Sequence, residues 1–115
     1  MQKEYNKLVR DRIPEMIEAN GATCQVTAMD EAEYQQTLHT KLVEEALEVA
    51  AAKQRGELIK ELADLQEVVS ALQALYQIDP AEVQAVQEQR RNERGAFERR
   101  LRLISVQIPD ESYTN

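Results

Sequence analysis

Five acidic residues on two neighbouring segments have the types and spacing of a metal-binding set. Glu44, Glu45 and Glu48 lie within one short stretch, and Glu61 and Asp64 follow after a spacer of twelve residues. Carboxylate oxygens in this number are the ligands that hard cations such as Mg²⁺ or Mn²⁺ prefer. The single histidine and the single cysteine do not stand at metal-ligand spacing, so the pattern does not favour zinc.

Glu61 occupies a position that a solvated surface does not explain. At about 100° per residue, Glu61 falls inside the apolar stripe of its helix, and Asp64 lies about 60° to one side. The stripe is formed by Leu58, Leu62, Leu65, Val68, Val69, Leu72 and Leu75. A carboxylate that faces a core is costly unless a cation or a metal pairs with it. The position of Glu61 therefore indicates a binding site.

The three upstream glutamates form a patch beside a second apolar stripe. With Glu44 set at 0°, Glu48 falls at about 40° and Glu45 at about 100°. Like charges three or four residues apart weaken a helix by tenths of a kcal/mol, roughly. A bound cation would offset this repulsion.

Two long helices must position these acids. The periodicity predicts helices at about 31–54 and 57–76, separated by a break at Arg55 and Gly56. A short break between long helices predicts an antiparallel hairpin. Glu48 and Glu61 would then lie at similar heights, and four or five carboxylates would converge on one spot.

The rest of the chain is expected to complete a single all-α domain over residues 1–115. The basic N-terminal segment at 1–29 contains a short helix at 14–20 and an extended connector or edge strand at 22–28. Asp30 is the expected N-cap of the first long helix. A third helix follows at about 80–90, and the C-terminal tail at 95–115 contains a candidate strand at 101–108. The wide apolar stripes leave more apolar surface than one chain easily covers, which predicts a homodimer or homotetramer.

Charge is uneven along the chain, whose formal net charge is -7. Ten acids against four bases between residues 30 and 67 give −6, and six arginines against three glutamates between residues 88 and 102 give +3. The overall acidity argues against broad nucleic-acid binding and against an anionic membrane surface. An acidic centre with a basic flank suits a metal–polyphosphate site, although acidic solvated helices are also common.

Other features predict a soluble cytoplasmic protein. One cysteine, Cys24, allows no intrachain disulfide, which favours a reducing compartment. The first twelve residues are charged and lack the apolar run of a signal peptide, and no stretch reaches the roughly 18 apolar residues of a membrane span. We expect Cys24 to be a small packed residue and His39 to be a surface or packed residue rather than a catalytic one.

The acids and their neighbours resemble the EExxE…ExxD signature of the all-alpha nucleoside triphosphate pyrophosphohydrolases. These are the MazG-like and phosphoribosyl-ATP pyrophosphohydrolase-like proteins. The surrounding residues 41–48 and 61–65 agree with this signature. Residues 5–14 and 94–97 look like segments of the smaller members of the family, so the resemblance covers most of the chain.

The resemblance implies an all-α fold with a four-helix-bundle-type core, completed by a second subunit. It implies Mg²⁺ held by the residues that match Glu44, Glu45, Glu48, Glu61 and Asp64. It also implies hydrolysis of a nucleoside triphosphate between the α and β phosphates, with release of pyrophosphate. Metal ions neutralise polyphosphate charge and lower the pKa of water. A carboxylate that is not fully committed to metal can take the proton of that water, and Glu45 is the candidate because it is angularly apart from Glu44 and Glu48.

Cationic side chains are needed beside the phosphates, because phosphoryl transfer is catalysed mainly by positioning and electrostatics. The guanidinium group suits bidentate phosphate contact. The candidates are Lys7, Arg10, Arg12, Arg91 and Arg94. The alternative is that these side chains serve solubility, and the Arg-Arg-Asn-Glu run at 90–93 departs from relatives that often carry Lys.

Several alternatives stay open. Phosphoribosyl-ATP could be the substrate of the same chemistry. The chain could instead be a non-catalytic helical oligomer that binds Mg²⁺ or Ca²⁺, or it could use residues 90–102 to bind nucleic acid. The acids could also form a solvated face, with Lys41 paired to Glu45 and Lys60 paired to Asp64.

Overall fold

The computed structural model describes residues 1–110 and contains four α-helices in that part of the chain. They are α1 (Ile13–Ala19), α2 (Glu31–Ala51), α3 (Arg55–Leu75) and α4 (Pro80–Arg94). No strand occurs among residues 1–110, which confirms the all-α class. The candidate strands at 22–28 and 101–108 are therefore wrong. Residues 111–115 of the predicted tail lie outside the described residues.

Helix α2 begins at a side-chain cap. Asp30 has an extended backbone, and its carboxylate accepts a hydrogen bond of 2.8 Å from the Glu33 amide. This contact satisfies one of the amides that the first turn leaves without a helical partner. The helix ends at Ala51, three residues before the predicted end, because Ala52 already has an extended backbone.

The turn between α2 and α3 precedes the predicted break. Gln54 is extended and caps α3, which begins at Arg55. Gly56 lies inside the first turn of α3, and its backbone has no positive φ. The chain therefore reverses at residues 52–54, where Ala52 and Gln54 have extended backbones, and Gly56 does not interrupt the helix.

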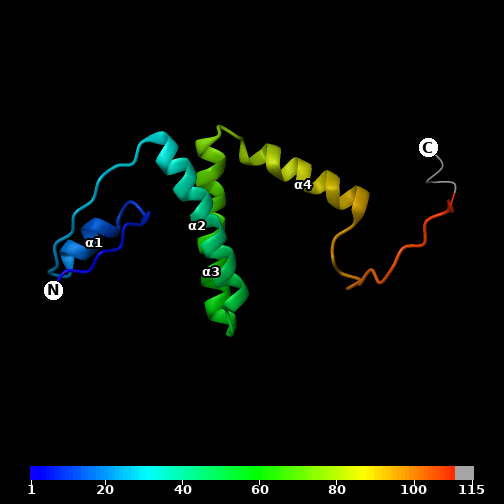
Figure 1. Cartoon of the computed structure of the whole chain (residues 1–115), viewed down its shortest axis with the longest axis horizontal. Helices are drawn as coiled ribbons and strands as arrows, with labels where there is room; N and C mark the ends of the chain where they lie inside the picture. Colours follow the sequence, from blue (N-terminus) through cyan, green and yellow to red (C-terminus); the bar gives the residue numbers. More distant parts are fainter. Residues whose placement is uncertain (111–115) are drawn as a thin grey trace. The chain divides into compact units, whose positions relative to one another are not determined.

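Helices α2 and α3 pack side by side as a hairpin (Figure 1). Leu38 and Val68 are the buried hydrophobic residues of the described chain, with 2% and 8% exposure. The buried polar residues of residues 1–110 are Glu45 and Glu61, with 7% and 8% exposure. The small core of this hairpin thus contains two acids, which is unusual because ionised residues are rarely buried without partners.

Apolar side chains remain exposed on both helices of the hairpin. Leu47 and Ile59 are 64% and 56% exposed, and Val43 is 58% exposed. Such a surface is compatible with a further packing partner. Completion of a four-helix core by a second subunit stays a prediction.

The chain divides into two compact units, Met1–Pro80 and a second unit that begins at Ala81. The second unit contains most of α4, which ends at Arg94, four residues later than predicted. Gly95 follows with φ of 84°, and its amide donates to the Arg91 carbonyl at 2.7 Å. A left-handed residue after the last turn is a common helix end, and glycine adopts it without a Cβ clash. The prediction of a single domain stays a prediction.

Among residues 1–110, no helix combines the length and the apolar character that crossing a bilayer requires.

The cap of α2 gives a direct test of this fold. We expect Asp30→Ala to lower the free energy of unfolding by about 1 kcal/mol, because the Glu33 amide loses its acceptor. Asp30→Asn should lower the free energy of unfolding much less, since asparagine is a comparable cap. Chemical denaturation followed by circular dichroism measures both changes. Equal losses in the two variants would contradict a capping role.

Candidate metal centre

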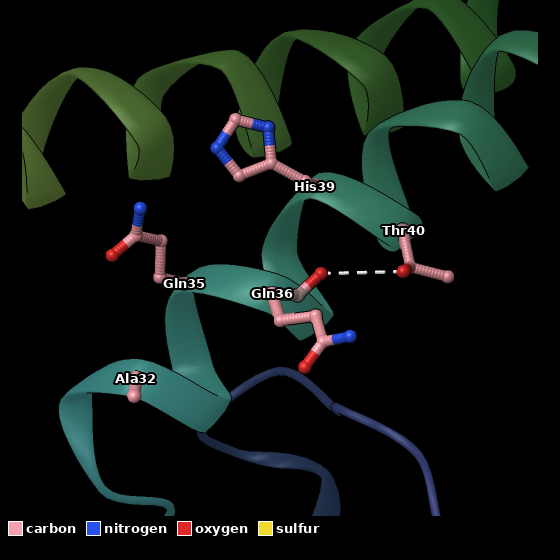
Figure 2. A pocket seen from close by; sticks show the side chains of 5 residues that line it. All are labelled: Ala32, Gln35, Gln36, His39 and Thr40. Carbon is pink, nitrogen blue, oxygen red and sulfur yellow. Dashed lines mark hydrogen bonds between the residues drawn. The ribbon is translucent and has the colours of Figure 1, made fainter.

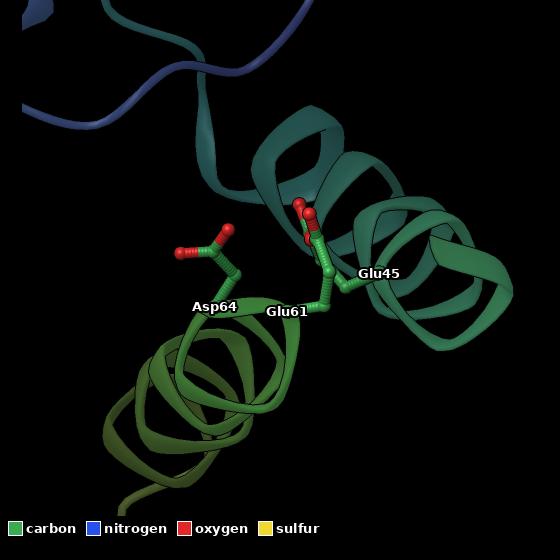
Figure 3. Close-up of side chains that lie close together, drawn as sticks. All are labelled: Glu45, Glu61 and Asp64. Carbon is green, nitrogen blue, oxygen red and sulfur yellow. The ribbon is translucent and has the colours of Figure 1, made fainter. Parts of the chain in front are cut away.

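Three carboxylates from the two helices of the hairpin converge on one point. Glu45 projects from α2, and Glu61 and Asp64 project from the same face of α3, three residues apart (Figure 3). One oxygen from each side chain lies within 4.8 Å of the other two. The hairpin therefore brings one acid of α2 to two acids of α3, where the sequence predicted a convergence of four or five carboxylates.

Two of these carboxylates are buried and incompletely partnered. In the described chain, Glu45 Oε2 and Glu61 Oε2 are buried oxygens with no hydrogen-bond partner. A buried charged oxygen without a partner is strongly unfavourable, since it has lost its water. A divalent cation would supply the missing partner to both oxygens at once. The donor set of carboxylate oxygens fits Mg²⁺ or Mn²⁺.

The electrostatics at Glu61 favour the neutral acid in the metal-free protein. The pKa of Glu61 is raised above its ordinary value of 4.5, first by a hydrogen bond with the Glu48 side chain. Burial and the negative charges of Glu48 and Asp64 raise this pKa further, whereas the Lys60 ammonium lowers it. Glu48 therefore lies beside Glu61, as predicted, and the crowded negative charge would be relieved by a cation.

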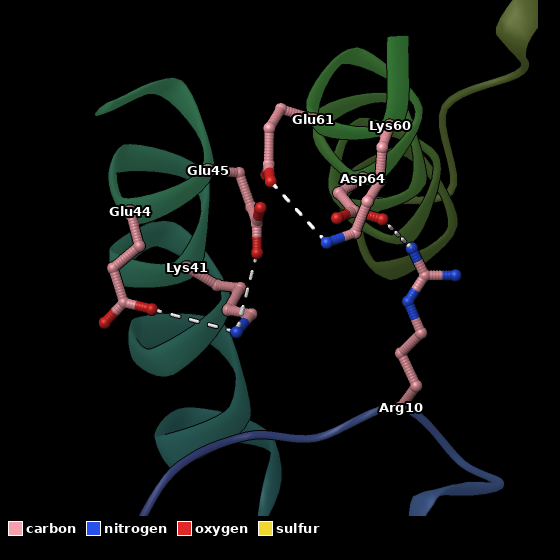
Figure 4. A network of polar contacts seen from close by, with 7 residues as sticks. All are labelled: Arg10, Lys41, Glu44, Glu45, Lys60, Glu61 and Asp64. Carbon is pink, nitrogen blue, oxygen red and sulfur yellow. Dashed lines mark hydrogen bonds and ion pairs between the residues drawn. The ribbon is translucent and has the colours of Figure 1, made fainter. Parts of the chain in front are cut away.

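Each of the three converging acids also has a cationic neighbour (Figure 4). Lys41 Nζ lies 3.6 Å from Glu45 Oε1, and Lys60 Nζ lies 3.9 Å from Glu61 Oε1. The closest pair joins Arg10 Nη2 to Asp64 Oδ1 at 2.8 Å. The two lysine distances exceed those of hydrogen bonds, so the lysines do not satisfy the buried oxygens. The solvated-face alternative was right about Lys41 and wrong about Lys60, which pairs with Glu61 instead of Asp64.

Glu44 lies outside the group of converging oxygens. Its side chain is 54% exposed, whereas that of Glu45 is 10% exposed. Glu44 Oε2 lies 3.8 Å from Lys41 Nζ. Adjacent residues are turned by about 100° on a helix, so they cannot both face α3. Its predicted role as a metal ligand stays a prediction.

The predicted phosphate-binding cations belong to two compact units. Lys7 lies over the Tyr5 ring, 5.6 Å from its centroid, and Arg12 pairs with Glu15 in the next turn. In the second unit, Arg91 and Arg94 line a shallow hollow after α4, together with Gln87, Arg90, Gly95, Ala96 and Phe97. Their phosphate-binding role stays a prediction.

A polar contact across the hairpin was not predicted. His39 Nε2 and the Tyr76 hydroxyl share a hydrogen bond of 2.8 Å, and their rings meet edge to face at 5.9 Å. His39 also lines a shallow hollow on α2 with Ala32, Gln35, Gln36 and Thr40 (Figure 2). An antiparallel hairpin pairs residues before Glu45 with residues after Asp64. Its register is the sequence signal that could have predicted this contact.

Comparisons with known proteins identify the family of this chain. A family described as "Phosphoribosyl-ATP pyrophosphohydrolase" matches residues 3–91, a range that includes all five predicted metal ligands. A relative from Mycolicibacterium smegmatis (strain ATCC 700084 / mc(2)155), described as an uncharacterized protein, is 47% identical over 49 residues. That alignment covers 43% of this chain and 50% of the relative, so this chain spans about half the length of the curated relative that it matches. No solved structure matches the chain.

Proposed function

Because the chain belongs to the phosphoribosyl-ATP pyrophosphohydrolase family, within the all-alpha nucleoside triphosphate pyrophosphohydrolase superfamily, we propose that it is a Mg²⁺-dependent nucleotide pyrophosphohydrolase. The reaction adds water across the anhydride between the α and β phosphates and gives a nucleoside monophosphate and pyrophosphate. The observation that carries this proposal is the pair of buried, unpartnered oxygens on Glu45 and Glu61. A bound cation would give both oxygens a partner.

Acidic side chains of both hairpin helices would hold the ion. Glu45, Glu61 and Asp64 offer converging oxygens, and Glu48 lies against Glu61. Glu44 completes the set that the family signature implies. When bound, Mg²⁺ neutralises polyphosphate charge and lowers the pKa of water. Mn²⁺ fits the same oxygen donors.

Glu45 is our proposed general base. One of its oxygens faces Lys41 at 3.6 Å, while the other has no hydrogen-bond partner and lies in the centre. A Glu45 oxygen that the ion leaves uncoordinated would accept the proton of an attacking water as that water adds to the anhydride. The burial of Glu45 also restricts competing water around the reacting atoms.

Basic side chains would bind the polyphosphate. The candidates from the first unit are Lys7, Arg10 and Arg12, and those from the second unit are Arg91 and Arg94. Arg91 and Arg94 support this role because they line one hollow. Negative charge on the phosphates would stabilise these clustered cations, and the planar guanidinium matches phosphate geometry.

Two substrate classes follow from the same chemistry. The first candidate is an unmodified nucleoside triphosphate. The second is phosphoribosyl-ATP, which the family description favours. Both carry the anhydride that the centre would hydrolyse, so the reaction is common to both and the nucleoside portion distinguishes them.

Metal removal gives the primary test of this function. With Mg²⁺, we expect stoichiometric release of pyrophosphate and a monophosphate from at least one member of a panel that includes phosphoribosyl-ATP and the common nucleoside triphosphates. A chelator should abolish turnover, because the carboxylates cannot neutralise phosphate charge, and added Mg²⁺ or Mn²⁺ should restore it. Enzyme-coupled pyrophosphate detection with chromatography of the nucleotide measures both products.

The outcomes separate this function from its alternatives. Release of inorganic phosphate instead of pyrophosphate would contradict cleavage between the α and β phosphates. Mg²⁺ binding without turnover of any panel member would instead support a non-catalytic metal-binding helical protein. A homodimer or homotetramer is part of our proposal, and light scattering of the full chain measures it.

A further inference from the structure

Arg10 is joined to the carboxylate centre by a contact between distant parts of the sequence. Its Nη2 donates to Asp64 Oδ1 at 2.8 Å, across a separation of 54 residues. This distance is typical of a charge-assisted hydrogen bond. Lys41 and Lys60 stand farther from their glutamates, at 3.6 and 3.9 Å. Of these three cations, Arg10 is therefore the one that holds its carboxylate most closely.

The contact engages Asp64 without separating it from the other acids. Asp64 Oδ1 accepts the hydrogen bond, and an Asp64 oxygen still lies within 4.8 Å of oxygens of Glu45 and Glu61. In Figure 4, the guanidinium approaches Asp64 from the side away from Glu45 and Glu61. Arg10 thus lies on the side of Asp64 that faces away from the other two acids.

We propose that Arg10 is a positioning residue for the metal centre: it holds the Asp64 carboxylate in the orientation that presents an oxygen toward Glu45 and Glu61. The proposal rests on the proposed function, since it requires these acids to bind a divalent cation. The Asp64 side chain is 30% exposed, whereas those of Glu45 and Glu61 are 10% and 11% exposed. Packing therefore confines Asp64 least, and it is the acid that most needs a partner to fix its orientation.

The role of Arg10 at Asp64 is compatible with phosphate binding. A guanidinium carries five N–H donors, and the contact with Asp64 uses one nitrogen. The Arg10 side chain is 58% exposed, so its other donors stay accessible to a polyphosphate. Arg10 would then connect the ion site to the substrate through one rigid group.

This arrangement couples ion binding to the N-terminal segment, residues 7–12. If the Arg10 contact favours the ion-binding orientation of Asp64, then ion binding must favour the Arg10 contact to the same degree, because linkage is reciprocal. Mn²⁺ should therefore slow hydrogen exchange of backbone amides in residues 7–12. This effect needs no nucleotide and no turnover.

The test compares Mn²⁺ affinities of the full chain without nucleotide, measured by electron paramagnetic resonance of free Mn²⁺. We expect Arg10→Gln to weaken binding by about 10- to 100-fold, which is typical for loss of a group that orients a ligand. Lys3→Gln is the control, because it removes the same charge from an exposed residue that precedes residues 7–12. Arg10→Lys should be intermediate, since it keeps the charge but not the planar fork.

The sign of the effect distinguishes positioning from simple charge. Removal of a positive charge near a cation site should by itself tighten cation binding. If Arg10→Gln binds Mn²⁺ more weakly, the cause is therefore that Asp64 has lost its orientation, because the loss of charge acts in the opposite direction. In an Asp64→Asn background, the further change caused by Arg10→Gln should fall below about twofold, because the two residues act through one contact.

Two results would overturn the proposal in distinguishable ways. If wild type binds Mn²⁺ and Arg10→Gln binds it equally or more tightly, Arg10 does not position Asp64, and the proposed function stands. If wild type does not bind Mn²⁺, the proposed function fails together with this inference. Hydrogen exchange of wild type with and without Mn²⁺ gives a second readout that requires no variant, and unchanged exchange in residues 7–12 would also count against the proposal.

Discussion

Substitution of Glu61 by glutamine is expected to reduce Mg²⁺-dependent turnover by more than about 100-fold, beyond the usual effect of losing a group that merely orients a ligand. Glu61 is buried to 8% exposure between Glu45 and Asp64, and one of its oxygens has no hydrogen-bond partner. Glutamine keeps the size of the side chain but removes its negative charge. Calorimetric titration measures the loss of Mg²⁺ affinity, and steady-state pyrophosphate release measures the loss of turnover.

The same substitution is expected to stabilise the metal-free protein at neutral pH. The pKa of Glu61 is raised in the folded state by the Glu48 hydrogen bond, by burial and by neighbouring negative charge. A group whose folded pKa is raised contributes stability that is present below its unfolded pKa and lost as the pH rises through its folded pKa. Wild type therefore loses this contribution as the pH rises, whereas glutamine has no proton to lose and keeps its stability.

The stability difference should depend on both pH and metal. Glu61→Gln should melt above wild type at pH 7 without metal, and the two melting temperatures should approach each other near pH 4. Saturating Mg²⁺ should reverse the order, since it stabilises the folded protein that binds it. Differential scanning fluorimetry with and without Mg²⁺ measures these shifts.

Glu67→Gln is the matched control for Glu61. Glu67 lies on the same helix and is exposed, so its substitution changes the same charge outside the carboxylate centre. We expect near wild-type turnover and no reversal of melting order with Mg²⁺. If Glu61→Gln keeps full Mg²⁺-dependent turnover, the assigned centre is wrong.

Substitution of Glu45 by glutamine should lower kcat by about 10²- to 10⁴-fold, the range expected for loss of a general base. Glu45 is 7% exposed and holds an unpartnered oxygen inside the centre. Because our proposal gives this residue a proton-accepting role, the loss should persist when Mg²⁺ saturates the variant. Turnover measured across a wide range of Mg²⁺ concentrations separates this effect from weakened metal binding.

The control for Glu45 is Glu31→Gln, an exposed acid in the first turn of the same helix. Its removal should cost a few tenths of a kcal/mol of stability, roughly, through the helix dipole, and it should leave kcat unchanged. Recovery of wild-type kcat by Glu45→Gln at high Mg²⁺ would show that Glu45 is a metal ligand without a role as base.

Much of the hairpin was predictable from local residue patterns. Asp30 caps α2 as predicted, because an aspartate that precedes a periodic apolar segment can accept a hydrogen bond from the first turn. Glu61 is buried as its place in the apolar stripe of α3 predicted. The all-α class followed from the same periodicity. These features depend on helix geometry, which residues close in sequence determine.

The turn and the selection among the acids were not predictable in the same way. Gly56 marked the expected break, but the chain reverses through residues 52–54, which include no glycine or proline. The resulting register directs Glu45 toward α3 and leaves Glu44 at 54% side-chain exposure. The angular positions of side chains on one helix do not predict which face of that helix packs against its neighbour.

The sequence by itself determined two long amphipathic helices, an acid within an apolar stripe and five carboxylates at the spacing of a metal-binding set. The tertiary structure alone decided that Glu45 meets Glu61 and Asp64, and that Arg10 binds Asp64 from 54 residues away. The physical reason is that helix periodicity is local, with neighbours three and four residues apart. Contacts between helices depend instead on how the turn sets their register and on which side chains packing buries.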